Sequence, residues 1–130
     1  MNLLLDTHVL LWWVRGHPES QLKKTHFDVL LNPENQLTLS YISIWEMAIK
    51  HSLGKLRLPA PAQEFAEFEV RDKSLTLLPI KLDHIGAYQK LPLTHSDPFD
   101  RMLAAQAKVE GLKLMTSDKN FDKLGIKRYW

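Results

Sequence analysis

Short apolar runs alternate with longer helical patterns along the 130 residues of this chain, and this alternation restricts the possible folds more than any other feature. The first run, residues 2–5, ends in three consecutive leucines, which is typical of a strand buried on both faces. Similar patterns predict strands at 36–39, 75–80, 112–116 and 126–129, and helices at 7–15, 20–31, 41–53, 62–71, 82–90, 98–110 and 119–124. Because strands separated by helices pair in parallel, the predicted fold class is α/β: a three-layer fold with a central parallel sheet of about five strands flanked by helices.

The composition is that of an ordinary globular chain, with 45% hydrophobic and 25% charged residues. We expect a single domain spanning residues 1–130, long enough to bury a core. No apolar stretch approaches the roughly 20 residues of a membrane span, and Asp6 interrupts the start of the chain, which argues against a signal peptide. The absence of cysteine excludes disulfides, thiolate metal sites and cysteine nucleophiles, so we expect a cytoplasmic protein.

Four acidic residues occupy positions where an α/β fold gathers chemistry. Asp6 and Asp118 each follow an apolar run, and Glu46 and Asp100 each fall in the first turn of a predicted helix. The carboxyl ends of parallel strands and the helix starts beside them form the ligand-binding edge of an open sheet. We therefore expect these four side chains to face one crevice.

Three of these acids also have structural explanations that the sequence leaves open. Asp6 and Asp118 are suitable N-caps for the helices that follow them. Glu46 can pair with Lys50 at the i,i+4 spacing, an arrangement that stabilises a helix by about 0.2–0.5 kcal/mol.

The segment 95–101 contains two acids three positions apart. Asp97 precedes Pro98 and is placed as the N-cap of the following helix, which suffices to explain it. Asp100 then falls at the third helical position, where the helix dipole favours an acid. The small residues after it permit close packing of the helix on the sheet, which would direct Asp100 toward the sheet edge rather than into water.

Several carboxylates in one crevice repel one another unless something neutralises them. Two carboxylates about 5 Å apart repel by roughly 3 kcal/mol at an effective dielectric constant near 20. Protonation or a bound cation relieves this repulsion. Oxygen ligands alone suit Mg²⁺ or Mn²⁺ better than zinc, and such an ion polarises a phosphoryl oxygen and activates water. The predicted reaction is hydrolysis of a phosphodiester.

Basic residues cluster at 50–57 and 119–128, although the net charge is only +2. Basic flanks around an acidic centre suit a polyanionic substrate, and solvated surface is the alternative. His8 and His95 are either contacts to phosphate, local acids or structural histidines. We expect core or interface positions, rather than base-stacking platforms, for the four tryptophans: Trp12, Trp13, Trp45 and Trp130.

Four segments together match a known pattern: residues 3–8 (LLLDTH), 43–46 (SIWE), 97–107 (DPFDRMLAAQA) and 114–118 (LMTSD). They resemble the PIN domain, and in particular the VapC-type toxins of type II toxin–antitoxin systems, over essentially the whole chain. The resemblance implies a PIN-like fold and a Mg²⁺- or Mn²⁺-dependent endoribonuclease that acts on single strands.

The resemblance also implies roles for particular residues. Asp6 and Asp100 would hold the metal, Glu46 would contribute directly or through water, and Asp118 would support a second ion or the water around the first. Asp97 is a secondary candidate for the metal. The residues expected from their positions to bind RNA are Lys50, Lys55, Arg57, Arg101 and Lys119. The implied partners are an RNA substrate, a cognate antitoxin that occludes the acidic crevice, and a second copy of the chain in a homodimer.

Two other functions fit the pattern less well. A non-catalytic PIN-like module that binds RNA or protein would tolerate a broken acidic set, whereas all four acids are present here. An aspartyl-phosphate enzyme with Asp6 as nucleophile would usually carry another acid two residues later, where this chain has His8. The sequence has no glycine-rich phosphate loop, which argues against hydrolysis of nucleoside triphosphates.

Overall fold

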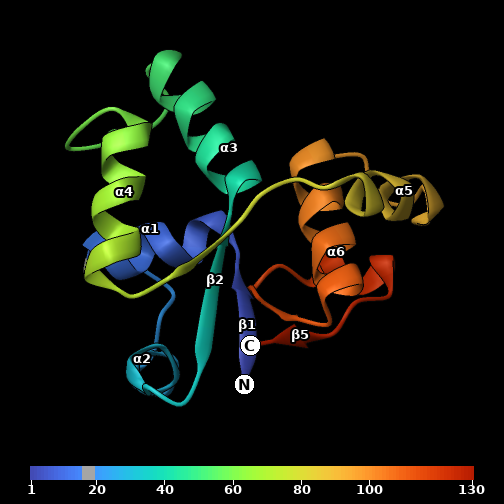
Figure 1. The fold of residues 1–130 in the computed structure, drawn as a ribbon, viewed down its shortest axis with the longest axis horizontal. Helices are drawn as coiled ribbons and strands as arrows, with labels where there is room; N and C mark the ends of the chain where they lie inside the picture. Colours follow the sequence, from blue (N-terminus) through green and yellow to red (C-terminus); the bar gives the residue numbers. More distant parts are fainter. Residues whose placement is uncertain (16–19) are drawn as a thin grey trace.

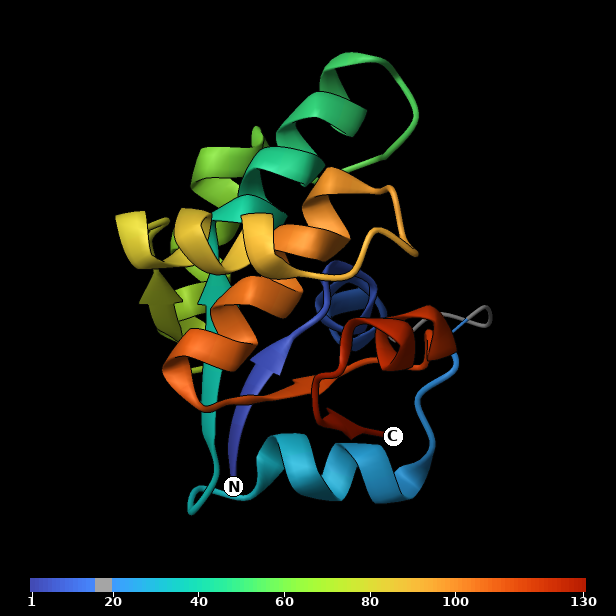
Figure 2. The same ribbon diagram turned by 90° about the vertical axis from the view of Figure 1, so that its right-hand side faces the viewer.

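The computed structural model describes residues 1–15 and 20–130, and its centre is a five-stranded parallel sheet (Figures 1 and 2). The strands are β1 (Asn2–Leu5), β2 (Gln36–Ser40), β3 (Thr76–Leu78), β4 (Lys113–Met115) and β5 (Arg128–Tyr129), in the spatial order β3-β2-β1-β4-β5. Every neighbouring pair is parallel, which confirms the predicted fold class. Strands β3 and β5 are shorter than the predicted 75–80 and 126–129; β3 ends before Pro79, which has no N–H to donate to the sheet.

Helices cover both faces of the sheet because successive leucines of β1 point to opposite sides. Leu3 and Leu5 join a core cluster with side chains of α1 (Thr7–Arg15), α2 (Lys24–Leu31) and α4 (Ala62–Asp72). Leu4 joins a second cluster with side chains of α5 (Leu82–Lys90) and α6 (Pro98–Glu110). The two groups of helices lie on opposite sides of β1 and β2 in Figure 1. Within the described ranges, no helix has the length and apolar character needed to cross a membrane. The other helices of the described residues are α3 (Tyr41–Ser52) and the 3₁₀ helix η1 (Lys119–Leu124).

Helix α2 is shorter than the predicted 20–31, because local hydrogen bonds compete with helix before Lys24. The Ser20 hydroxyl accepts a hydrogen bond from the N–H of Leu22 at 3.1 Å, which forms a turn. The His26 ring then accepts one from the N–H of Lys23 at 3.0 Å at the start of the helix. Gly16, which by its sequence position closes the first predicted helix, and Pro18, which precedes the second, lie outside the described residues.

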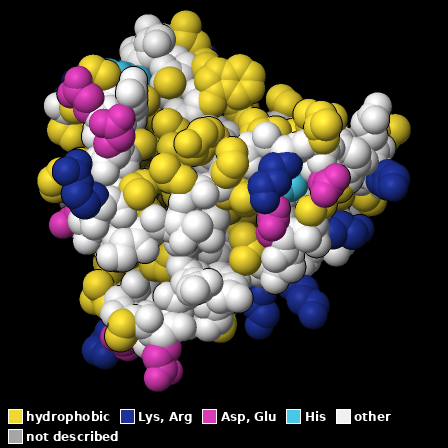
Figure 3. All heavy atoms as spheres, in the orientation of Figure 1, with side chains coloured by type: hydrophobic (Ala, Val, Ile, Leu, Met, Phe, Trp, Pro, Cys, Tyr) yellow, Lys and Arg dark blue, Asp and Glu magenta, His cyan; other side chains and the backbone are white. Residues whose placement is uncertain are grey.

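The apolar spacing of Ile42, Trp45, Ile49 and Leu53 predicts the inner face of α3, but of these only Ile42 is buried. Trp45 and Leu53 are 58% and 63% exposed, whereas Glu46 and Met47 are buried. Apolar side chains accordingly gather at the surface over α3, α4 and α5 in Figure 3. The burial of Glu46 in place of Trp45 means that this acid requires polar partners inside the fold.

A buried polar network connects α6 to the start of α3. Gln106 of α6 is fully buried, and its Oε1 accepts a hydrogen bond from the hydroxyl of Ser40. Ser40 is the N-cap of α3, where its Oγ also accepts a backbone N–H. The other end of the Gln106 amide contacts His84 Nδ1 at 3.3 Å. The network fixes the helix that carries Glu46 relative to the helix that carries Asp100.

Replacement of this cap tests the network. We expect Ser40→Ala to lower the free energy of unfolding by about 1–3 kcal/mol, because α3 loses its N-cap and Gln106 Oε1 is left buried without a donor. Urea unfolding measures the change. The matched control is Ser52→Ala on the same helix, whose exposed hydroxyl donates only to the carbonyl of Ala48, and which we expect to cost less than about 0.5 kcal/mol. Equal losses in the two variants would contradict the role of Ser40.

Candidate active site

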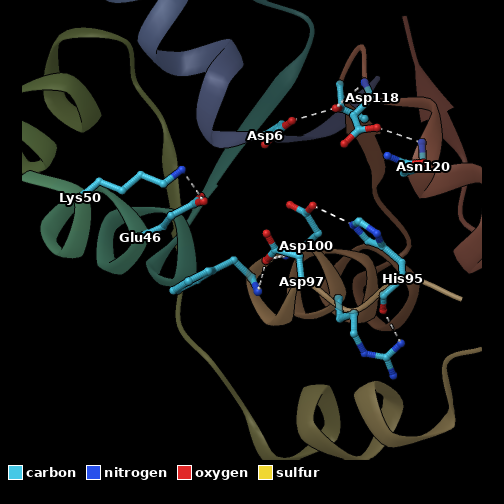
Figure 4. A network of polar contacts seen from close by, with 11 residues as sticks. Asp6, Glu46, Lys50, His95, Asp97, Asp100, Asp118 and Asn120 are labelled. Atoms are coloured by element: carbon cyan, nitrogen blue, oxygen red, sulfur yellow. Dashed lines mark hydrogen bonds and ion pairs between the residues drawn. The ribbon is translucent and has the colours of Figure 1, made fainter. Parts of the chain in front are cut away.

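Five acidic side chains line one cavity of about 310 Å³, which we call the acidic cavity (Figure 4). They come from the end of β1, from α3, from the start of α6 and from the segment after β4. The parallel pairing of β1 with β4 brings the first and last of these segments together. The structure thus brings together the four acids that the sequence places at one sheet edge, Asp6, Glu46, Asp100 and Asp118, and adds Asp97, the secondary candidate.

Asp6 is buried at the end of β1 and is held by one threonine hydroxyl. Thr116 Oγ1 donates a hydrogen bond to Asp6 Oδ2 at 2.8 Å and accepts one from the N–H of Asp118 at 3.1 Å. Burial raises the pKa of the Asp6 carboxyl, the Thr116 hydrogen bond and the neighbouring His8 oppose this, and the charge of Glu46 raises the pKa further. Asp6 therefore carries its negative charge at a cost in free energy.

Glu46 lies in the second turn of α3, not in the first turn as predicted. Its carboxylate accepts a hydrogen bond from Thr7 Oγ1 at 2.8 Å through Oε1, and Lys50 Nζ lies 3.0 Å from Oε2. The i,i+4 ion pair considered from the sequence is therefore present. However, Glu46 is only 7% exposed and lies in the wall of the acidic cavity, while its partner Lys50 remains partly exposed.

Asp100 points into the acidic cavity from the first turn of α6 (Figure 4). Its Oδ2 lies 2.8 Å from His95 Nε2. Burial raises the pKa of Asp100 to about 6; the hydrogen bond from His95 opposes this shift, and the negative charges of Asp97 and Asp6 add to it. Asp100 and Asp6 therefore disfavour each other's ionised form.

Asp97 and Asp118 are both helix caps, as their positions in the sequence suggest. Asp97 Oδ1 accepts hydrogen bonds from the N–H groups of Phe99 and Asp100 at 2.8 and 3.2 Å. Asp118 Oδ1 accepts one from the N–H of Asn120 at 2.9 Å. Capping thus accounts for one oxygen of each acid, while both side chains also line the acidic cavity.

The basic residues predicted to bind RNA lie in different environments. Lys50 lines the acidic cavity, and Lys55, Arg57 and Lys119 are exposed. Arg101 is 5% exposed, and its guanidinium donates to three backbone carbonyls. The acceptors are the carbonyls of Pro92 at 2.7 Å, His95 at 3.1 Å and Tyr88 at 3.2 Å. This placement contradicts the prediction that Arg101 contacts RNA, since its donors hold the loop before α6.

Several residues that line the cavity, or that bond its acids from behind, were not predicted from the sequence. Thr7 and Thr116 hold Glu46 and Asp6, and each is a hydroxyl residue one or two positions from an acid, which is the signal available in the sequence. Three further residues line the cavity but were not predicted to belong to it: Trp12, Gln21 and Ser117.

The chemistry of these donors fits a hard divalent cation. The cavity offers carboxylate oxygens from several elements, and two of the carboxyls have pKa values raised by burial and by mutual repulsion, which a cation would relieve. In residues 1–15 and 20–130, no three acidic or histidine side chains already converge closely enough to hold an ion. The side chains would therefore have to close around a cation.

Comparisons with known proteins agree with the resemblance seen in the sequence. The PIN domain family model matches residues 3–127. VapBC2 from Rickettsia felis, bound to a DNA fragment from its promoter, contains a chain similar in structure, with 18% identity, coverage of 98% of this chain and 96% of that one, and a TM-score of 0.73. FitAcB from Neisseria gonorrhoeae is 21% identical, with coverage of 98% of this chain and 96% of that one and a TM-score of 0.69. DNA-bound VapBC from Salmonella typhimurium is 20% identical, with the same two coverages and a TM-score of 0.71. No curated protein matches the sequence.

The raised pKa of Asp100 has a measurable effect on stability. Between about pH 4 and pH 6 the folded chain keeps a proton on Asp100 that the unfolded chain releases, so this group's contribution to stability falls as the pH rises through that window. We expect Asp100→Asn, measured in EDTA at pH 7.5, to have an equal or higher melting temperature than the unaltered chain and a weaker pH dependence between pH 4 and pH 6.

The neighbouring acid provides the comparison. Asp97→Ala removes the N-cap of α6 and is expected to lower stability by about 1 kcal/mol under the same conditions. A comparable loss in Asp100→Asn would show that Asp100 acts mainly as a stabilising acid of the first helical turn.

Proposed function

The chain belongs to the PIN domain family, whose model matches residues 3–127, and from this premise we propose that it is a metal-dependent endoribonuclease and the toxin of a type II toxin–antitoxin pair. The observation that carries the proposal is the acidic cavity, where carboxylates from four separate segments meet. Bringing these carboxylates together costs free energy, because they are desolvated and repel one another, and a cation bound by several of them would offset that cost.

Asp6 and Asp100 would hold the ion, because the Asp6 carboxyl is buried, the Asp100 carboxyl is partly buried, and the charge of Asp6 raises the pKa of Asp100. Glu46 would contribute directly or through water, Asp118 would support a second ion or the water around the first, and Asp97 is a secondary candidate because it already caps α6. When bound, Mg²⁺ or Mn²⁺ supplies Lewis-acid polarisation of the phosphoryl group and activation of water for hydrolysis.

Residues bonded to the cavity's acids orient their carboxylates. Thr116 fixes Asp6 Oδ2, Thr7 fixes Glu46 Oε1, and His95 fixes Asp100 Oδ2. Each contact restricts the rotation of a carboxylate that would otherwise turn away from its neighbours, which is how the partners of metal-binding groups tune an ion site.

Exposed basic residues would attract the RNA backbone to a cavity that is itself negative. Lys50 lies in the cavity wall and is 41% exposed in its side chain, even though it pairs with Glu46. Lys119 directly follows Asp118, and Lys55 and Arg57 follow the end of α3. Their charges favour approach of a polyanion, and this attraction weakens as salt is added.

A toxin of this kind has protein partners in addition to its RNA substrate. The similar structures are VapBC and FitAcB complexes, two of them bound to DNA. By analogy we propose that this chain is inhibited by a cognate antitoxin protein and forms a homodimer. Purification with the product of a neighbouring reading frame would test the first of these partners.

Metal-dependent cleavage is the direct test of the nuclease. We expect the purified chain to cut a pool of transfer and ribosomal RNA into discrete fragments with Mg²⁺ or Mn²⁺ and to leave it intact in EDTA. Asp6→Asn should lower the rate at least about 100-fold and abolish the rise in melting temperature caused by Mn²⁺, because a buried ligand is lost. Gel electrophoresis and thermal denaturation provide the two measurements.

Glu34→Gln is the matched control, since this exposed acid precedes β2 at the opposite end of the sheet strands and should change neither result. Cleavage that persists in EDTA or in Asp6→Asn would contradict the proposal. RNA retention by both proteins without cleavage would identify a binding module instead.

A further inference from the structure

Of the four tryptophans, Trp12 is the one whose side chain lines the acidic cavity. It lies on α1 one turn after His8, and the centroids of the two rings are 5.9 Å apart. Asp6 immediately precedes α1. Asp6 and the aromatic wall of the cavity are thus parts of one continuous segment.

The other three tryptophans do not line this cavity. Trp13 packs against the core, and Lys73 Nζ lies 5.0 Å from the centroid of its ring. Trp130 stacks on His26 with a centroid distance of 3.9 Å and an interplanar angle of 26°. Trp45 is exposed and contacts Phe99 edge to face at 5.6 Å. Trp13 and Trp130 pack against the core, as expected from the sequence, whereas Trp45 is exposed.

No ring among the described residues lies flat against Trp12. Its two ring neighbours, His8 and Trp130, are both 5.9 Å away and are tilted by 43° and 56°. Trp12 is also absent from the partly buried side chains that pack against either hydrophobic core within the described ranges. A half-buried indole, not covered in parallel by another ring, therefore borders the carboxylates without being needed to fill the core.

We propose that Trp12 is a stacking platform for an unpaired RNA base next to the phosphate that is cleaved, an inference that rests on the proposed nuclease function. Aromatic side chains stack on any nucleobase, and in single-stranded RNA the bases are free to leave their neighbours. A phosphate held at the carboxylate end of the cavity places an adjoining base within reach of its aromatic wall. The expectation that all four tryptophans are structural is revised for this one residue.

The test compares two ligands that differ only in their bases. One is a fluorescently labelled single-stranded oligouridylate of twelve nucleotides, and the other is a ribose-phosphate oligomer of equal length without bases. Fluorescence anisotropy in Mg²⁺ measures binding to the Asp6→Asn chain, which should not cut either ligand, and to the same chain carrying Trp12→Ala, Trp12→Phe or Trp45→Ala.

We expect Trp12→Ala to weaken binding of the oligouridylate at least about 5-fold and to leave binding of the base-free oligomer unchanged. Trp12→Phe keeps an aromatic face and should retain most of the affinity. Trp45→Ala is the matched control, an exposed tryptophan outside the cavity, and should bind both ligands normally.

Equal weakening of both ligands by Trp12→Ala would overturn the platform, as would an unchanged affinity for the oligouridylate or the binding of neither ligand by the Asp6→Asn chain. The nuclease is judged separately by cleavage with the unaltered chain. Base-dependent binding through Trp12 without metal-dependent cleavage would reject the nuclease and support the stacking role of Trp12. Metal-dependent cleavage without base-dependent binding through Trp12 would support the nuclease and reject the stacking role.

Discussion

The parallel pairing of β1 with β4 is the constraint on which the rest of the site depends. Leu5 is in register with Met115, and the N–H of Asp6 donates to the Met115 carbonyl at 3.1 Å. Both strands end in fully buried apolar side chains, and a slip of one residue would turn each of them to the opposite face of the sheet. The apolar core thus fixes where Asp6 and the Thr116–Asp118 segment leave the sheet. The mutual repulsion of the carboxylates opposes this arrangement.

The fold and the position of the acids follow from the sequence because they depend on local patterns. The leucine run of β1 and the proline and glycine that bound α6 are signals within a few residues of the elements they define. The carboxyl ends of parallel strands meet at one edge whatever the loops do, so Asp6 and Asp118 were placed correctly without any knowledge of distances.

The remaining features depend on contacts between distant segments, which periodicity does not reveal. Arg101 follows Asp100 directly and was expected to bind substrate, yet the next position on a helix faces about 100° away, toward the loop carbonyls. Glu46 was placed at the first turn of its helix beside an apolar Trp45, whereas the structure buries the acid and exposes the tryptophan. The hydroxyl of Thr7, distant in sequence, makes that burial tolerable.

The hydroxyl of Thr116 has a consequence for how changes at the site combine. It has a single hydrogen, which is donated to Asp6, while its oxygen receives the N–H of Asp118. Two acids at opposite ends of the chain therefore share one atom as a common partner. Groups that share a partner do not respond independently, so the energetic effects of substitutions at Asp6 and Asp118 will not add, and neither residue can be assigned a contribution of its own.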